Sequence, residues 1–286
     1  MIISIASGKG GTGKTTIATN LAFSLKADAV LLDCDVEAPN SHLFLNPKFE
    51  KTETVYTPVP EIDFEKCTLC GKCAEICRFN SIAVLPEKVL TFPELCHSCG
   101  GCFEVCPENA VSEAKRELGT IGSGYCGDIF FVNGRIRVGE AMAPPLIKKV
   151  KSYIDKRKIN IIDAPPGTSC PVMTAMKNTD FVLLVTEPTP FGLHDLTLAV
   201  EAVKVLNIPC GLVINRADMG DSRVKDYAED NNIPILMEIP FDRKIAEIYS
   251  RGELIVSAMP KFKEKFVELY HSIAEIVKRS KKGCAN

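Results

Sequence analysis

The sequence has no long apolar run, no excess of charge of one sign and no Ser/His/Asp or Cys/His set typical of covalent hydrolases. Its 34 lysines and arginines are balanced by 36 aspartates and glutamates, which argues against a protein that binds nucleic acid mainly through charge. No apolar run approaches the ~18 residues needed to span a bilayer, and the start lacks the pattern of a signal peptide. We therefore expect a cytoplasmic protein that binds neither nucleic acid nor a membrane.

Cysteine, by contrast, is abundant, with 13 residues among 286. Because the cytoplasm keeps thiols reduced, metal binding explains these cysteines better than a disulfide framework does. Eight of them occur in two copies of one motif, CTLCGKCAEIC from Cys67 and CHSCGGCFEVCP from Cys96. This internal repeat predicts a small pseudo-symmetric module.

The spacing within each copy, with gaps of two, two and three residues, is that of bacterial ferredoxins with two [4Fe–4S] clusters. In that pattern, three cysteines of one copy and the last cysteine of the other hold each cluster. Arg78 stands where a proline is usual, but all eight thiols are present. Zinc is the alternative metal for any CxxC pair, yet it has no need of two such runs. The spacing therefore assigns Cys67, Cys70, Cys73 and Cys106 to the first cluster, and Cys96, Cys99, Cys102 and Cys77 to the second.

Outside this segment, short apolar runs alternate with helical stretches, which is typical of an α/β fold with a mostly parallel sheet covered on both faces. After Pro260, apolar residues at helical spacing predict a helix docked on the sheet, and a membrane-surface helix is the alternative. Buried strands are predicted at 2–7, 29–35, 160–165, 181–187, 210–216 and 234–240, and helices from about 13, over 193–206 and over 221–231.

Residues 8–15, GKGGTGKT, match the phosphate-binding pattern G-x-x-x-x-G-K-[ST] and lie between a predicted strand and a predicted helix. Glycines let backbone N–H groups close around phosphates, and the helix N-terminus adds its positive dipole end. Lys14 is expected to reach the β- and γ-phosphates, and the Thr15 hydroxyl to bind Mg²⁺. The expected phosphate-binding residues are Gly8, Lys9, Gly10, Gly11, Thr12, Gly13, Lys14, Thr15 and Thr16.

The second lysine of this loop, Lys9, makes it similar to the deviant Walker A loop of the MinD/ParA/Mrp class of P-loop ATPases, which includes the nitrogenase iron protein. The resemblance covers residues 1–45 and roughly 140–260. It implies that Lys9 crosses a dimer interface to the partner's nucleotide, and that Asp35 positions the attacking water or the Mg²⁺ shell. It also implies a switch II aspartate at Asp163 with Gly167 after it, adenine recognition by Asn215 and Arg216, and a base-covering loop of Pro240, Phe241 and Asp242.

The cysteine-rich segment interrupts the α/β fold. We expect a discontinuous P-loop ATPase domain of residues 1–59 and 116–286, and an inserted small α+β ferredoxin-like domain of residues 60–115. The proline-containing stretch 46–63 is expected to be a linker, and the glycine-rich stretch 117–128 follows the insertion. Asn133-Gly134 between two apolar runs predicts a type I′ hairpin turn.

Five cysteines lie outside the repeat. Cys34 and Cys210 are predicted in the core, and Cys284 in the C-terminal tail. Cys170 follows the switch II pattern closely, where the nitrogenase iron protein has a cysteine that bridges a cluster between subunits. Cys126 is a companion for it only by exclusion, and a small packed thiol is the alternative for Cys170.

Together these features imply an ATP-hydrolysing iron–sulfur protein in which dimer rearrangement is coupled to electron transfer. Its cofactors would be ATP or ADP, Mg²⁺ and two [4Fe–4S] clusters. Its partners would be a second copy or a paralogue in a nucleotide-dependent dimer, and a redox or apo-protein partner. Two alternatives stay open: an Mrp-type carrier of iron–sulfur clusters or metal, and a MinD-type positioning ATPase with the clusters as a redox sensor.

Overall fold

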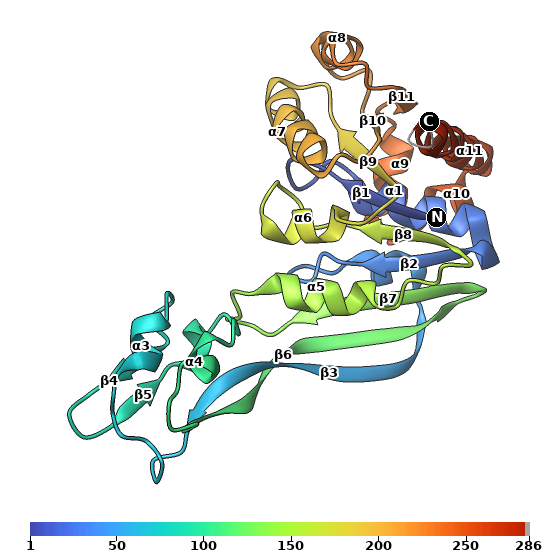
Figure 1. Ribbon diagram of the computed structural model, residues 1–286. Coiled ribbons are helices and arrows are strands. Elements are labelled where there is room, and N and C mark those ends of the chain that lie inside the picture. The colour runs from blue at the N-terminus through green and yellow to red at the C-terminus, as the bar shows by residue number, and fades with distance from the viewer. Residues whose placement is uncertain (284–286) are drawn as a thin grey trace.

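The computed structural model describes residues 1–283, which form a nine-stranded sheet and a separate two-stranded sheet (Figure 1). In the large sheet the strand order is β11-β10-β9-β1-β8-β2-β7-β6-β3, and the first seven of these strands are parallel. This confirms the α/β fold with a mostly parallel sheet. The strands are β1 (Ile2–Ala6), β2 (Ala29–Asp33), β3 (Lys48–Ile62), β4 (Ile82–Val84), β5 (Val89–Thr91), β6 (Val111–Cys126), β7 (Ile129–Ile136), β8 (Ile159–Asp163), β9 (Phe181–Thr186), β10 (Cys210–Asn215) and β11 (Ile235–Ile239).

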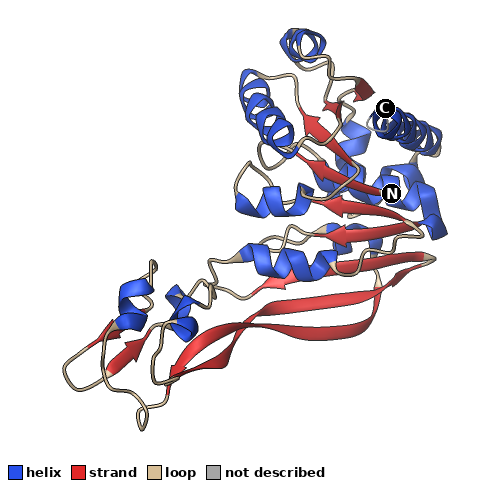
Figure 2. Cartoon of the chain, viewed as in Figure 1, coloured by secondary structure: helices blue, strands red, loops and turns tan. Residues whose placement is uncertain are grey.

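Helices cover both faces of the parallel part of the sheet, as Figure 2 shows. One apolar layer lies under α1, α10 and α11, and the other under α5, α6, α7 and α8. The helices are α1 (Lys14–Leu25), α2 (Ser41–Leu45), α3 (Lys72–Ile76), α4 (Gly101–Glu104), α5 (Ala143–Lys151), α6 (Cys170–Met176), α7 (Pro190–Leu206), α8 (Arg223–Asp230), α9 (Arg243–Ser250), α10 (Ile255–Ala258) and α11 (Lys261–Gly283).

The C-terminal helix α11 is docked on the sheet, as predicted. Phe262, Phe266, Leu269, Ile273 and Val277 recur every three or four residues and are all buried in the core. Each such side chain contributes about 1.5–3 kcal/mol when removed from water, so the apolar stripe is sufficient to hold the helix on the sheet. Within residues 1–283, no helix combines the length and apolarity that crossing a membrane requires.

A long antiparallel arm replaces the linker expected at 46–63. Residues 48–62 form β3, which pairs along its length with β6. Strand β6 begins at Val111 and includes residues 117–126 of the glycine-rich stretch. Pro58 and Pro60 are compatible with a strand because β3 is the outermost strand of the sheet and has one unpaired edge. The arm therefore connects the cysteine-rich segment directly to the sheet.

The hairpin predicted at Asn133-Gly134 is also wrong, because β7 runs straight through both residues. The turn lies instead at Gly127 and Asp128, where Cys126 pairs with Ile129 and Gly127 has a φ of 56°. A Cβ atom at Gly134 would lie 2.7 Å from the Val36 side chain, so this glycine permits close packing within a strand.

The cysteine-rich module lies at the far end of the arm, beyond Ile62 and before Val111 (Figure 1). It contains α3, α4 and the small sheet of β4 and β5. Strands β3 and β7 both run antiparallel to β6, so β3 ends on the same side as the carboxyl ends of the parallel strands. Sheet topology thus directs the module toward the edge where ligands bind in open α/β sheets.

Candidate functional site

The loop between β1 and α1 has the backbone of a phosphate-binding loop. Gly11 and Gly13 have φ values of 80° and 102°, which side chains other than glycine rarely adopt. No atom within 4 Å would contact a Cβ at Gly10 or Gly11, so this part of the loop is open. Helix α1 begins at Lys14, which places its N-terminal N–H groups beside the loop.

A cavity of about 380 Å³ adjoins this loop. Its apolar wall includes Ile17, Ile239, Ile245 and Tyr249, which suits a flat base, while its polar wall is the loop itself. Among the residues that the sequence singled out, the cavity is lined by Gly10, Gly11, Gly13, Lys14, Thr15, Thr16, Asp35, Asn215, Arg216, Pro240, Phe241 and Asp242. Gly8, Lys9, Thr12, Asp163 and Gly167 do not line it.

Two carboxylates lie buried behind Lys14 at adjacent strand ends. Asp33 and Asp163 are paired in register between β2 and β8 and are fully buried. The Ser41 backbone N–H donates to Asp33 over 3.1 Å, and its hydroxyl donates to Asp163 Oδ2 over 3.0 Å. Asp163 Oδ1 is buried and has no hydrogen-bond partner among the described residues. An unpaired buried acceptor of this kind is uncommon in folded proteins.

Burial is the largest cause of the pKa shifts of Asp33, Asp163 and Lys14. It raises the pKa of Asp163 to about 6, against the opposing effects of the nearby Thr15 hydroxyl and the Lys14 charge. Burial together with the Asp163 charge holds the pKa of Asp33 well above its usual range. Burial lowers the pKa of Lys14, and the charges of Asp163 and Asp35 partly restore it. The loop lysine and the carboxylates therefore form one electrostatically linked group.

Lys9 lies outside the cavity and faces a carboxylate of its own chain. Its Nζ is 3.9 Å from Glu187 Oε2, and Glu187 also pairs with Arg216 Nη1 over 2.9 Å. The Asn215 amide donates to the Thr12 carbonyl over 2.9 Å and packs against Gly13. In the single chain, Lys9 thus lies beside the loop and does not line the cavity.

The two cysteine motifs repeat each other in backbone as well as in sequence. Leu69 and Ser98 both have positive φ values, 57° and 55°, and each lies directly before the second cysteine of its motif. Gly71 and Gly100 follow that cysteine with φ values of 82° and 80°, and they precede α3 and α4. Such turns orient backbone N–H groups toward one point, as sites for anionic groups require.

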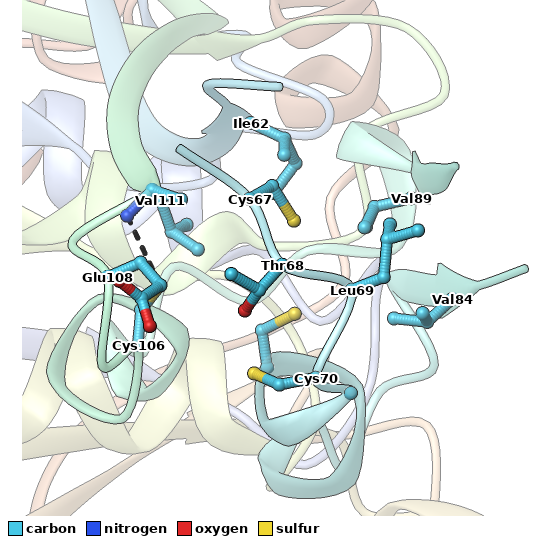
Figure 3. Close-up of a pocket in the computed structure, with 13 residues that line it drawn as sticks. Ile62, Cys67, Thr68, Leu69, Cys70, Val84, Val89, Cys106, Glu108 and Val111 are labelled. Atoms are coloured by element: carbon cyan, nitrogen blue, oxygen red, sulfur yellow. Dashed lines mark hydrogen bonds between the residues drawn. The ribbon is translucent and has the colours of Figure 1, made fainter. Parts of the chain in front are cut away.

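The eight cysteines of the motifs line two cavities, four to each. Cys67, Cys70, Cys73 and Cys106 line the first, and Cys77, Cys96, Cys99 and Cys102 line the second. In Figure 3, Val84 and Val89 lie on one side of the first cavity and Cys106 with Glu108 on the other. Backbone N–H groups of Ser81, Ser98 and Ala110 donate to the sulfurs of Cys77, Cys96 and Cys106.

The thiols surround these cavities without converging on a single point. Within residues 1–283, no three Cys, His, Asp or Glu side chains are arranged to hold one metal ion. A single tetrahedral zinc with bonds of about 2.3 Å draws its four sulfurs close together. The thiols, among the described residues, therefore form no single-ion site.

The cysteines outside the motifs are dispersed. Cys34 is buried in the core, as predicted, and Cys210 is half-buried at the start of β10. Cys170 is exposed at the first residue of α6. Cys126 ends β6, which runs against the parallel strands, so it lies at the opposite edge of the sheet from Cys170. Cys126 and Cys170 are therefore not neighbours within one chain. Cys284 lies outside the described residues.

A comparison with known protein families covers most of the chain. A family model described as the CobQ/CobB/MinD/ParA nucleotide binding domain matches residues 3–255. The chain belongs to this family. The matched range includes the phosphate loop, both buried aspartates and the whole arm with its cysteine-rich module.

The chain is also similar to individual proteins and solved structures. An uncharacterised protein of Methanocaldococcus jannaschii is 36% identical over 97% of this chain and 98% of its own length. An iron–sulfur cluster carrier protein of Aquifex aeolicus is 26% identical over 96% of this chain and 66% of its own length. The septum site-determining protein MinD of Pyrococcus horikoshii, solved with Mg-ADP, is 22% identical over 96% of both chains, with a TM-score of 0.59. The likeness to the MinD structure shows that this chain and that protein share a fold.

Several residues of this chain that lie at the nucleotide edge of the sheet belong to no sequence motif and were not predicted. Asn40 and Tyr249 line the cavity, Ser41 bonds Asp163, and Glu187 holds Lys9 and Arg216. Only Glu187 carries a local signal, since it directly follows a buried strand. The others reach the site through loops and helices whose positions depend on the folded sheet.

The buried carboxylates predict a pH-dependent stability of the nucleotide-free protein. Asp163 has a raised pKa, so the folded state binds more protons than the unfolded state between about pH 4 and 6. Stability is therefore lost as the pH rises through this window. Asp163→Asn should raise the free energy of unfolding at pH 8 by up to about 3 kcal/mol, at about 1.4 kcal/mol per pKa unit, and have a smaller effect near pH 4. Denaturant titrations at both pH values test this, with the exposed Asp230→Asn as control; an equal effect at both pH values would contradict it.

Proposed function

We propose that the protein binds and hydrolyses ATP as a nucleotide-dependent dimer and transfers electrons through two [4Fe–4S] clusters, as the nitrogenase iron protein does with one. The observation that supports this most strongly is the distribution of the eight motif cysteines over two cavities, four to each. The ferredoxin spacing predicts the same two sets of four. The arm directs both cavities toward the nucleotide edge of the sheet.

The nucleotide edge fits Mg-ATP. The open glycine loop and the start of α1 suit the phosphates, Lys14 supplies a buried cation, and the apolar wall suits the base. Thr15 and Asp35 both line the cavity and would hold Mg²⁺ or its water shell. Phosphoryl transfer then depends on positioning and charge neutralisation, with no covalent nucleophile required.

The cysteine cavities fit clusters. Each has four thiols from one chain, and backbone N–H groups donate to three of the eight sulfurs. Such hydrogen bonds stabilise negative charge on a cluster and tune its potential. Clusters held by these cysteines would supply one-electron redox chemistry between a donor and an acceptor protein. The zinc alternative is disfavoured because zinc has no need of two runs with the same spacing.

A second function is favoured by the relatives. Proteins of Aquifex aeolicus and Pyrococcus furiosus, 26% and 25% identical to this chain, are named iron–sulfur cluster carrier proteins. In a carrier, a cluster would be transferred whole to an apo-protein instead of cycling between redox states. Each cavity has a full set of four thiols from one chain, which favours keeping a cluster over releasing it. We therefore rank electron transfer first.

One experiment separates the two functions. Anaerobic redox titration, monitored by electron paramagnetic resonance, is carried out with Mg-ADP and with a non-hydrolysable ATP analogue. A shift in cluster potential between the two nucleotides is expected for an ATP-gated electron carrier. Unchanged potentials, combined with ATP-dependent transfer of iron and sulfide to an apo-ferredoxin, would establish the carrier function instead.

Cluster content can be tested directly. Anaerobically purified protein is expected to contain about 8 iron and 8 sulfide per chain, from two cubanes. Cys70→Ser should lose about half of this iron, because Cys70 lines the first cavity, whereas the exposed Cys170→Ser should lose none. Tightly bound zinc in colourless anaerobic protein would refute the cluster assignment.

A further inference from the structure

The second cysteine cavity is attached to the α/β fold by a buried arginine. Arg116 on β6 donates from Nη1 to the Pro93 carbonyl and from Nη2, over 3.4 Å, to the carbonyl of Cys96. Cys96 lines the second cavity. The Thr57 hydroxyl on β3 also lies 2.7 Å from the hydroxyl of Ser98 in the same loop. The loop that provides Cys96 and Cys99 is therefore fixed to both strands of the arm.

Arg116 is in turn paired with Glu140, in the loop between β7 and α5. Arg116 Nη2 lies 2.9 Å from Glu140 Oε2 and 3.1 Å from Oε1. The two side chains are only 7% and 1% exposed. Glu140 Oε1 also accepts from the backbone N–H of Met142, the residue before α5. A second ion pair, Arg137 with Glu94, joins the same loop directly to the 93–95 turn of the cysteine-rich module.

Helix α5 connects this pair to the nucleotide edge. At its C-terminal end, Lys151 Nζ donates to the carbonyls of Thr174, Ala175 and Lys177, over 2.9, 2.7 and 2.6 Å, and so holds the end of α6. Helix α6 directly follows the loop after Asp163, and in that loop Gly167 N–H donates to the Ser7 carbonyl. Hydrogen bonds and two helices thus link the phosphate loop to Cys96.

The first cysteine cavity has no such connection. Its loop is bonded within the module, by Cys67 N–H to the Asp63 carbonyl and by Asp63 N–H to the Ala110 carbonyl. In the part of the chain that the structure describes, no side-chain hydrogen bond or ion pair joins residues 64–73 to the α/β fold. In Figure 1, α3, β4 and β5 also lie farthest from the layered sheet.

We infer that the Arg116–Glu140 pair couples the nucleotide edge to the Cys77/Cys96/Cys99/Cys102 site, and that this site alone responds to the bound nucleotide. The inference rests on the proposed function. Arg116 is a positioning residue: it acts through the backbone of Cys96. A buried ion pair suits this role because it resists separation, so a shift of α5 moves Glu140, Arg116 and the Cys96 loop together. The other site is then free to face a redox partner.

The test is hydrogen–deuterium exchange on the anaerobic holoprotein, with Mg-ADP and with a non-hydrolysable ATP analogue. In the wild type, exchange in 163–177 and in 93–102 is expected to differ between nucleotides, by about fivefold or more, a typical allosteric coupling. Exchange in 64–73 should not differ. The double variant Arg116→Gln/Glu140→Gln, which leaves no unpaired buried charge, should lose the difference in 93–102 and keep it in 163–177.

Arg116→Lys keeps the charge without the planar fork and should give a partial loss, while Arg157→Gln, at an exposed ion pair, should give none. Reduction potentials in both nucleotide states provide a second readout. If the pair has only a structural role, the double variant should shift the potential by the same amount with Mg-ADP and with the ATP analogue. If the pair couples the sites, the double variant should lose the difference in potential between the two nucleotide states. Iron content of each variant shows that its clusters are intact; if the double variant loses iron, Arg116→Lys, which keeps the buried charge, replaces it.

The outcomes separate the inference from the proposed function. If 163–177 does not respond to nucleotide in the wild type, the proposed function fails, and the inference with it. If 163–177 responds but 93–102 does not, the inference alone is wrong. It is also overturned if the double variant keeps the response of 93–102, or if 64–73 responds as strongly as 93–102.

Discussion

Replacing Lys14 with alanine is expected to reduce ATP hydrolysis by about 10³-fold or more while both clusters remain bound. Lys14 is buried, lines the nucleotide cavity and provides a positive charge beside Asp163 and Asp35. Among the described residues that line the cavity, Lys14 is the only lysine. Steady-state hydrolysis and iron content measured on the same sample test both parts of this prediction.

Two matched variants complete the experiment. Lys204→Ala removes an exposed lysine that pairs with Glu201, and it should leave hydrolysis unchanged. Cys99→Ser should show the reverse of Lys14→Ala, with loss of one cluster and nucleotide affinity retained within a few fold. Unchanged hydrolysis in Lys14→Ala would refute the assignment of the phosphate loop. Loss of nucleotide binding in Cys99→Ser would mean that the cysteine-rich module and the α/β part of the chain are not independent folding units.

Lys9→Ala is expected to retain ATP binding but to lose hydrolysis by about 10³-fold, by analogy with arginine fingers. Lys9 lies outside the cavity and faces Glu187 of its own chain, so removing it leaves the cavity wall intact. In the proposed dimer it would contact the nucleotide of the facing subunit. ATP should therefore tighten the wild-type dimer, and Lys9→Ala should lose this effect in sedimentation experiments.

A mixing test decides whether Lys9 acts across the interface. Lys9→Ala chains are combined with Asp35→Asn chains, each inactive alone. A mixed dimer then contains one site with an intact Asp35 and the partner's intact Lys9, and part of the activity should return. If proven mixed dimers remain inactive, Lys9 acts within its own chain and the shared-nucleotide dimer is excluded.

Local patterns were sufficient to predict the parallel core of the fold. The strands at 2–7, 181–187 and 210–216 are short apolar runs buried on both faces, and such runs have few other stable arrangements. The loop of residues 8–15 was equally clear, because its chemistry depends on consecutive residues. Polar residues at several strand ends then had to meet, since the carboxyl ends of parallel strands share one edge.

The arm was not predictable from local sequence. Residues 46–63 contain prolines and residues 117–128 contain glycines, and both patterns usually indicate loops. They form β3 and β6 because they pair with each other across the inserted module, and this pairing also places Pro58 at an edge. Asn133-Gly134 was misread for the same reason: its pairing with neighbouring strands outweighs its turn preference.

The sequence by itself determined the chemistry available to this protein: a phosphate loop with two lysines, aspartates at strand ends, and eight cysteines in a duplicated spacing. These depend on residues near one another in the chain. Only the tertiary structure decided how the two chemistries are connected. Arg116 and Glu140 carry no motif, and they are 24 residues apart. They form a pair because the register of β6 against β7 and the start of α5 bring them together in the interior, where two opposite charges must be neighbours.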